Sequence, residues 1–178
     1  MDDRGLVDAV LAGDRDAFRI LVEREQVAVF RACLRILGRP HDAEDVAQES
    51  FVMAYRSLGT YRGRGSLGAW LMRIATRQAF RRLGQRRADV ELTPGMPLTA
   101  PDPDPLAAAL AGERQREVRL AVAALSEPYR EVVALRYFGE LSLEEIARAT
   151  GRPLNTVKTH LRRGLERLRP SLGGEVAA

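Results

Sequence analysis

The side chains best suited to chemistry in this sequence form an acidic cluster in the segment HDAEDVAQE. His41, Asp42, Glu44 and Asp45 could together ligate a divalent metal ion, as imidazole and carboxylate groups do in metal-dependent hydrolases. No second histidine or carboxylate cluster follows in the same half of the chain, because His160 lies beyond a proline-rich segment. We therefore expect no metal, and keep a hydrolase built on His41 as an alternative.

The rest of the sequence also argues against an enzyme. Cys33 is the only cysteine, so an internal disulfide and a zinc site of several thiolates are excluded, and its apolar surroundings predict a buried thiol. No phosphate-binding glycine loop, nucleophile–base pair, signal peptide or membrane-spanning apolar run is evident. We expect a cytoplasmic protein that is not an enzyme, has no cofactor or small-molecule substrate, and does not insert into a membrane.

A helix–turn–helix is predicted near the C-terminus, in SLEEIARATGRPLNTVKTHLRRGLERL. Ser142 and Glu145 have the spacing of a capping box, Gly151 favours the end of the first helix, and Pro153 favours the start of the second. Apolar side chains then repeat along one side of the second helix, namely Leu154, Val157, Leu161, Leu165 and Leu168. The second helix can therefore pack on its neighbour through this side and present the other.

The presented face of that second helix carries groups that can contact nucleic acid. Hydroxyl, amide, imidazole and guanidinium side chains lie there: Asn155, Thr156, Thr159, His160, Arg162, Arg163 and Arg167. Such groups reach base edges and phosphates when a helix enters the major groove. Lys158, the only lysine among 28 basic residues, lies at the shoulder of the apolar side, where we expect its amine to meet a phosphate. These features favour DNA binding over a helical hairpin with a solvated basic face.

A second candidate for nucleic-acid contact is the segment TYRGRGSLGAWLMRIATRQAFRRL, where a glycine-rich loop leads into an arginine-bearing helix. Aromatic rings interleaved with basic residues suit single-stranded nucleic acid, because unstacked bases pack on the rings and phosphates pair with the cations. Helical spacing places Trp70 in the core beside Leu67, Leu71 and Ile74, whereas Tyr61 could be either a core residue or a stacking platform.

The acidic cluster has a second interpretation as a docking strip. Asp45, Gln48 and Glu49 are three and four residues apart, so they share one face of a helix. This face is either solvated or a contact for a basic partner protein, and the sequence alone leaves both open.

Helical periodicity accounts for almost the whole chain, and strand signals are nearly absent. We predict helices over 16–37, 41–58 and 66–87, then a proline-rich linker, then a return of helical spacing from about residue 106. The predicted fold class is all-α, with two small helical domains joined by a flexible linker. The predicted boundaries are 1–87 for the first domain, 88–112 for the linker, 113–170 for the second domain and 171–178 for a tail.

In their order along residues 14–170, these motifs resemble an extracytoplasmic-function (ECF, group IV) RNA polymerase sigma factor of the sigma-70 family. DAEDVAQESFVMAYRSL resembles the part of sigma region 2 that binds the β′ clamp helices of the polymerase. YRGRGSLGAWLMRIATRQAFRRL resembles the adjoining part that opens and holds the −10 promoter element. LSEPYREVVALRYFGELSLEEIARATGRPLNTVKTHLRRGLERLR resembles region 4, whose helix–turn–helix reads the −35 element.

The resemblance implies roles for individual residues. Polymerase contacts are expected at Asp45, Gln48, Glu49 and Arg56. Contacts with −10 DNA are expected at Tyr61, Arg62, Gly63, Arg64, Arg73, Arg77 and Arg81. Contacts with the −35 duplex are expected at Arg152, Asn155, Thr156, Lys158, Thr159, Arg162 and Arg163. The family often has Gly at Asn155, Ser-Arg at Thr159-His160 and Asn at Arg77, so the promoter sequence itself is not predicted.

The resemblance further implies a non-catalytic specificity subunit. Its expected partners are core RNA polymerase, through the β′ clamp helices and the β flap, promoter DNA, and an anti-sigma factor that could hold it at the membrane. The linker acids Asp102 and Asp104 could mimic RNA phosphates near the polymerase active centre or belong to a solvated tether. Besides the hydrolase, a free-standing helix–turn–helix regulator stays as an alternative, although it leaves residues 41–83 unexplained.

Overall fold

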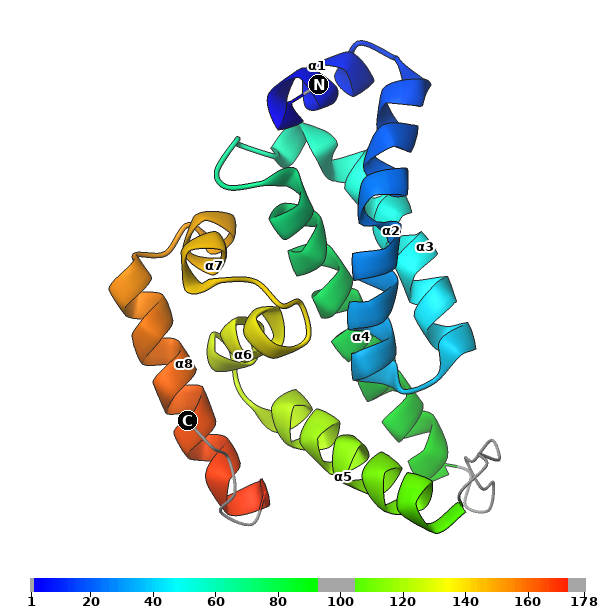
Figure 1. The fold of residues 1–178 in the computed structure, drawn as a ribbon, viewed down its shortest axis with the longest axis vertical. Helices are drawn as coiled ribbons and strands as arrows, with labels where there is room; N and C mark the ends of the chain where they lie inside the picture. The colour runs from blue at the N-terminus through cyan, green and yellow to red at the C-terminus, as the bar shows by residue number, and fades with distance from the viewer. Residues whose placement is uncertain (1, 93–104, 173–178) are drawn as a thin grey trace.

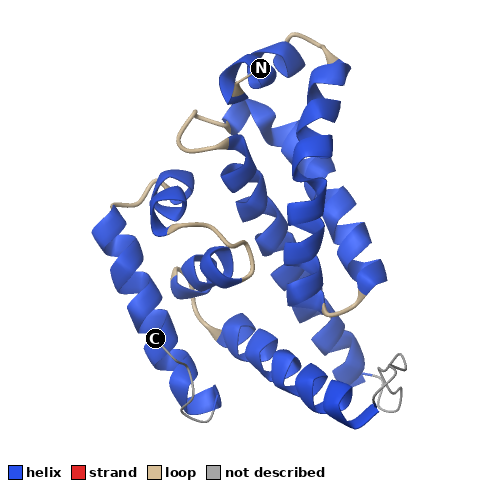
Figure 2. Cartoon of the chain, in the orientation of Figure 1, coloured by secondary structure: helices blue, strands red, loops and turns tan. Residues whose placement is uncertain are grey.

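In the parts of the chain that the computed structural model describes, residues 2–92 and 105–172, helices joined by loops are the only regular secondary structure (Figure 2). Before residue 93 the helices are α1 (Asp3–Leu11), α2 (Arg15–Leu37), α3 (Pro40–Ser57) and α4 (Leu67–Leu92). After residue 104 they are α5 (Pro105–Ala124), α6 (Tyr129–Tyr137), α7 (Leu143–Thr150) and α8 (Leu154–Leu168). Short 3-10 helices follow α3 and α8, namely η1 (Leu58–Thr60) and η2 (Arg169–Leu172). The predicted all-α fold class is confirmed.

Local sequence signals set many of the helix ends. The carboxylates of Asp2 and Asp14 accept hydrogen bonds from backbone N–H groups in the first turns of α1 and α2. Gly38 ends α2 in the left-handed conformation with φ of 71°, and Pro40 occupies the first position of α3. The helices predicted over 16–37 and 41–58 are confirmed to within a residue at each end. The short helix α1 was not predicted.

Helices α1 to α4 form the first domain around an apolar core (Figure 1). Leu21 and Ile36 of α2, Val46 of α3 and Leu71 of α4 are completely buried. Cys33 lies in the same core, and burial raises the pKa of its thiol to about 12. The prediction of a buried and unreactive thiol is consistent with this environment.

The second domain consists of α6, α7 and α8, with α5 packed along α6. Each of these last three helices contributes a completely buried apolar residue: Val132 and Leu135 from α6, Ile146 from α7 and Val157 from α8. Val122 of α5 is also buried in this core. The core holds the short α7 against the ends of α6 and α8, and thereby fixes the geometry of the helix–turn–helix.

The two domains pack against each other through α4, which contacts both α6 and α7 (Figure 1). Phe80 of α4 meets Phe138 edge to face, with 5.8 Å between ring centroids. A Cβ atom placed on Gly139 would lie 2.8 Å from Cγ of Met72, so backbone and side chain meet closely here. One apolar cluster therefore continues from the first domain into the second. Periodicity predicted the helices but not this contact.

Both ends of the predicted linker, 88–112, are helical. α4 continues to Leu92, and α5 begins at Pro105. Proline is tolerated in the first turn of a helix, and the segment after it is rich in alanine and leucine, which favour helix. Asp102 and Asp104, which could either mimic RNA phosphates or belong to a solvated tether, lie outside the described residues.

Candidate nucleic-acid interface

The helix–turn–helix has the local geometry that its sequence predicts. The hydroxyl of Ser142 accepts a hydrogen bond from the backbone N–H of Glu145 at 3.2 Å, and the carboxylate of Glu145 accepts one from the backbone N–H of Ser142 at 2.8 Å. The carboxylate of Glu145 accepts hydrogen bonds from both the backbone N–H and the hydroxyl of Ser142, and these two bonds lower its pKa. Gly151 then ends α7 in the left-handed conformation with φ of 68°. The predicted capping box and turn are confirmed.

Helix α8 packs on α6 through its predicted apolar side. Val157 and Leu168 are buried, and the other three predicted residues, Leu154, Leu161 and Leu165, are half-buried. Gly164 makes the approach close, because a Cβ atom there would lie only 2.7 Å from Cγ2 of Val133. With this side covered, the opposite side of α8 faces solvent. Asn155, Lys158, Arg162 and Arg163 are exposed there, and Thr156 and Thr159 are partly exposed.

His160 is half-buried against Tyr129 of α6, contrary to the prediction that it belongs to the outer face of α8, whereas Arg167 is exposed as predicted and also contacts this tyrosine. The imidazole of His160 meets the ring of Tyr129 edge to face at 5.6 Å, and the guanidinium of Arg167 lies 3.9 Å from the centroid of the same ring. Burial, and then the charges of Arg152 and Arg163, lower the pKa of His160. Helical spacing places His160 at the margin of the face, where its contact with the neighbouring tyrosine leaves it half-buried.

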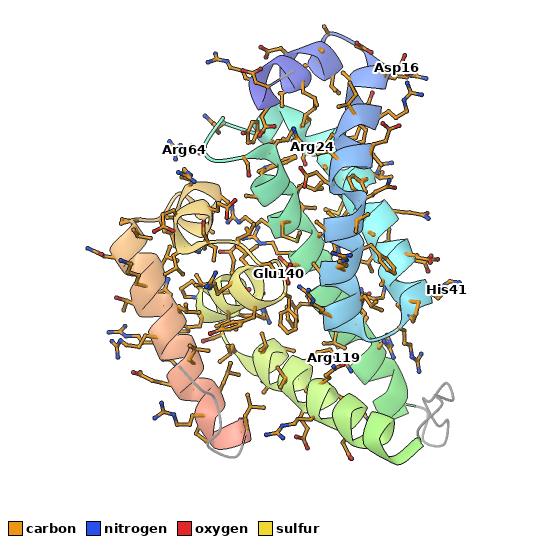
Figure 3. All side chains as sticks on the ribbon, in the orientation of Figure 1. Asp16, Arg24, His41, Arg64, Arg119 and Glu140 are labelled. Atoms are coloured by element: carbon orange, nitrogen blue, oxygen red, sulfur yellow. The ribbon has the colours of Figure 1, made fainter. Side chains whose placement is uncertain are left out.

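Contacts from α1 hold the start of α4, directly after the glycine-rich loop. The carboxylate of Asp3 accepts a hydrogen bond from the backbone N–H of Leu67 at 2.6 Å and another from Arg24 at 2.8 Å. Figure 3 shows Arg24 on α2, facing this junction. Sequence reasoning missed Asp3 and Arg24, because a cap supplied from a distant helix has no local signature.

The glycine-rich loop is anchored where it begins and ends, and its tip is exposed. The hydroxyl of Tyr61 donates to the carbonyl oxygen of Gly65 at 2.6 Å, and its ring lies 5.8 Å from that of Trp70. Burial, and then the charge of Asp3, raise the pKa of Tyr61. Tyr61 is therefore half-buried, between the two environments that the sequence left open. The tip residues Arg62, Gly63 and Arg64 are exposed, and Figure 3 shows Arg64 beside α7.

Arginines predicted to bind DNA converge on one buried acid, Glu131 of α6. Arg73 and Arg77 of α4 donate to Oε1 of Glu131 at 2.7 and 2.6 Å, and Arg152 donates to Oε2 at 2.6 Å. Burial alone would raise the pKa of Glu131, but hydrogen bonds from Arg73 and Arg152 and the nearby positive charges outweigh it and lower the pKa. Arg81, farther along α4, is exposed. Sequence reasoning missed Glu131, which has the position of an ordinary acid in the first turn of a helix.

The predicted docking strip lies on the exposed face of α3. Asp45 is partly exposed and Gln48, Glu49 and Arg56 are exposed, so all four side chains are accessible on this helix. Glu49 is also paired with Arg82 of α4 at 2.8 Å.

Two apolar side chains interrupt this polar strip. Val52 and Met53 are 49% and 41% exposed, although both are large hydrophobic residues. Their spacing from Glu49 and Arg56 puts them on the same face of α3. Sequence reasoning overlooked them, and the available signal was an apolar pair at positions where the helix otherwise presents polar groups. Exposed apolar residues among charged ones are typical of protein interfaces.

The acidic cluster examined as a metal site is divided between separate partners. His41 pairs with Asp45 at 3.2 Å, whereas Asp42 pairs with Arg86 of α4 at 3.0 Å (Figure 3 labels His41). Within residues 2–92 and 105–172, no group of three or more His, Cys, Asp or Glu side chains is arranged to hold a metal ion. Helical geometry thus separates residues that the sequence places side by side.

Comparisons with known proteins agree with this arrangement. Residues 21–88 match the family described as Sigma-70 region 2, and residues 115–168 match Sigma-70, region 4. The ECF RNA polymerase sigma factor SigW of Bacillus subtilis is 34% identical over 93% of this chain and 94% of its own length. The chain belongs to the ECF RNA polymerase sigma factors. As a sigma factor it is not an enzyme, and it directs RNA polymerase to promoters.

Other relatives of this sigma factor have the same extent. The RNA polymerase sigma-H factor of Pseudomonas aeruginosa is 33% identical over 96% of this chain and 93% of its own length. Among solved structures, CnrH in complex with the cytosolic domain of CnrY is similar with a TM-score of 0.61 and 25% identity, covering 97% of this chain and 98% of CnrH. The sigma factor RpoE of Bartonella quintana, solved with the anti-sigma factor NepR, shares the fold with a TM-score of 0.54 and 21% identity, over 89% and 98% of the two chains.

The match places region 2 on α2 to α4 and region 4 on the end of α5 through α8. The free-standing regulator and the hydrolase are both excluded as descriptions of this sigma factor, since region 2 accounts for residues 41–83. Among the described residues, no helix combines the length and the hydropathy needed to cross a bilayer.

Proposed function

We propose that this sigma factor assigns its three tasks to three separate surfaces. The exposed face of α8 reads the −35 duplex, and the glycine-rich loop with Arg73, Arg77 and Arg81 of α4 holds the single strand of the −10 element. The exposed face of α3 docks on the clamp helices of core polymerase. The observation that carries this proposal is the division of α8 into a covered apolar side and an exposed side of amide, hydroxyl, ammonium and guanidinium groups.

The docking surface of α3 includes more than the charged residues. A basic partner helix can pair with Asp45 and Glu49, while Val52 and Met53 supply apolar area that becomes buried on contact. Because a charge placed on this apolar area would have to be buried without a partner, a carboxylate at Val52 is expected to weaken docking.

In vitro transcription tests the proposal as a whole. The purified protein is mixed with core RNA polymerase and fragmented genomic DNA, and start sites are mapped. We expect initiation at a limited set of sites that share two upstream sequence elements. Absence of site-specific initiation by a folded protein would refute the proposed function.

A matched pair of valines tests the docking surface. Val52→Asp on α3 should weaken binding to core polymerase by about tenfold or more, because contact would bury an unpaired carboxylate. Val27→Asp on α2, where the valine is similarly exposed at 55%, should change binding by less than about twofold. Equal effects of the two substitutions would remove α3 from the interface.

We further propose that an anti-sigma factor binds this protein in the cytoplasm and keeps it from polymerase. The support is the similarity to CnrH, which was solved in complex with the cytosolic domain of another protein. Copurification from cells grown without an inducing stress, followed by mass spectrometry, tests this point. Recovery of the sigma factor with polymerase alone under those conditions would contradict it.

A further inference from the structure

Glu131 on α6 is a buried carboxylate with an excess of positive partners. Its side chain is only 2% exposed, and it accepts hydrogen bonds from Arg73, Arg77 and Arg152 at 2.6–2.7 Å. One carboxylate neutralises the charge of one guanidinium group. Three arginines around Glu131 therefore leave positive charge that this carboxylate does not neutralise. The arrangement is therefore more than a balanced structural ion pair.

This cluster joins the two domains. Arg73 and Arg77 belong to α4 of region 2, whereas Glu131 and Arg152 belong to region 4. Arg73 also donates to the carbonyl oxygen of Ala149, at 3.4 Å, next to the end of α7. If the domains separated, Glu131 would keep Arg152 and lose both partners on α4.

A second polar contact lies elsewhere in the same interface. Arg35 of α2 pairs with Glu140 at 2.6 Å and also donates to the carbonyl oxygen of Phe138 at 3.3 Å. Figure 3 shows Glu140 between the end of α6 and the first domain. Arg35 and Glu140 are exposed, at 40% and 66% of their side chains, and neither belongs to a surface assigned to DNA or polymerase.

The contact with α6 occupies the same α4 arginines that the proposed function assigns to single-stranded DNA. Guanidinium groups bind carboxylate and phosphate oxygens through the same charge-assisted hydrogen bonds, so Glu131 and a DNA phosphate exclude each other at these atoms. The end of the glycine-rich loop also approaches α7, because a Cβ atom on Gly65 would lie 2.9 Å from Cβ of Arg148, while the loop tip stays exposed. A cavity of about 410 Å³ adjoins the cluster, and its lining includes Arg77 and Arg81 as well as Arg130, which is paired with Glu127.

We propose that Glu131 takes the place of a DNA phosphate in the free protein, and that α6 and single-stranded promoter DNA compete for the arginine face of α4. When the two domains are packed together, Arg73 and Arg77 are bound by Glu131 of region 4. Separation of the domains releases both arginines for DNA. This inference rests on the proposed function, since it takes α4 as a single-strand site, but it concerns the sigma factor without polymerase.

Binding of the full-length free protein to labelled single-stranded DNA tests the competition. The probe is fluorescein-labelled DNA of mixed sequence, about twelve nucleotides long, because phosphate contacts do not depend on sequence. Glu131→Gln should bind this probe about tenfold more tightly than the wild type, as one charged competitor is removed. Glu23→Gln removes the same charge from an exposed position of α2 and should change the affinity by less than about twofold.

Arg35 and Glu140 provide a test that does not disturb a buried residue, should Glu131→Gln fail to fold. Arg35→Glu and Glu140→Arg each break the exposed pair, but they change the net charge by two in opposite directions. If the packing of the two domains competes with DNA binding, both variants bind the probe about threefold more tightly than the wild type. The double variant then returns to the wild-type affinity. The same single variants should enlarge the radius of gyration measured by small-angle X-ray scattering.

Two results would overturn the proposal. One is a folded Glu131→Gln protein that binds no more tightly than Glu23→Gln. The other is a pair of Arg35 and Glu140 variants that follow net charge, the first binding more weakly and the second more tightly. Neither result affects promoter-directed initiation by the wild type, which tests the proposed function separately.

Discussion

Adding one methyl group at Gly164 should loosen the contact between α8 and α6 and destabilise region 4. The new Cβ atom would lie 2.7 Å from Cγ2 of Val133, whereas unstrained carbon atoms stay about 3.5–4.0 Å apart. Val133 is 1% exposed, and a valine in a helix has one strongly preferred rotamer, so its methyl group has little room to move aside. The helices must separate to accept the methyl group.

The expected magnitude combines two opposing effects. Overpacking of a well-filled contact typically destabilises by about 1–3 kcal/mol. Replacing glycine by alanine inside a helix stabilises by roughly 0.5–1 kcal/mol, because alanine restricts the unfolded chain. The net effect of Gly164→Ala is then a loss of about 0–2.5 kcal/mol in the free energy of unfolding, and each kcal/mol lowers the melting temperature by about 2–4 °C.

Gly84→Ala in α4 is the matched control. Gly84 is exposed within a helix, and a Cβ atom there would meet nothing within 4 Å. This variant keeps the helix-propensity gain and omits the overlap, so it should raise the free energy of unfolding by roughly 0.5–1 kcal/mol. Urea unfolding followed by circular dichroism compares the two variants under the same conditions.

Because the helix-propensity gain is common to both variants, Gly164→Ala should be less stable than Gly84→Ala by the overpacking cost of about 1–3 kcal/mol. A Gly164→Ala protein that unfolds at the same or a higher urea concentration than Gly84→Ala would show that α8 does not approach α6 as closely as described. Weaker binding of Gly164→Ala to −35 duplex DNA should accompany the loss of stability, because the seating of α8 positions its outer face.

Three further predictions concern DNA contacts, acid stability and the thiol. In binding titrations, Arg163→Ala should weaken binding to the −35 duplex by about 1–3 kcal/mol and relax selectivity at one base pair. Lys158→Gln should weaken binding to all promoters alike, and should reduce by about one the slope of log affinity against log salt concentration. A loss at Lys158 that depends on the promoter would rule out a phosphate contact. The folded-state pKa of Glu131 is lowered from 4.5, so its contribution to the free energy of unfolding is present above pH 4.5 and is lost as the pH falls below that value. When the free energy of unfolding is measured in urea at several pH values, Glu131→Gln should reduce its decrease below pH 4.5. An unchanged decrease would show that Glu131 does not cause it. Cys33 should react with a thiol reagent only on unfolding, because burial raises its pKa to about 12, and fast labelling of the native protein at pH 8 would contradict that.

Sequence periodicity and helix caps predicted most elements of the fold. The capping box of Ser142 and Glu145 and the glycine at 151 are local signals, since they involve residues within a few positions of each other. The apolar side of α8 likewise follows from helical spacing alone. Because the helix–turn–helix is built from such signals, its outer face was predicted except at His160, which a neighbouring ring half-buries.

The partners of the arginines depend on tertiary structure. Nothing local distinguishes Arg73 and Arg77 from other bases on α4, or Glu131 from other acids in a first helical turn. Their contact exists because the packing of α4 against α6 brings together residues more than fifty positions apart. Asp3 caps α4 across an even larger separation. The sequence by itself determined which helices form and which faces they bury. Packing decided which charged side chains meet, because pairing between charges depends on their distance in space and leaves no periodic signal along the chain.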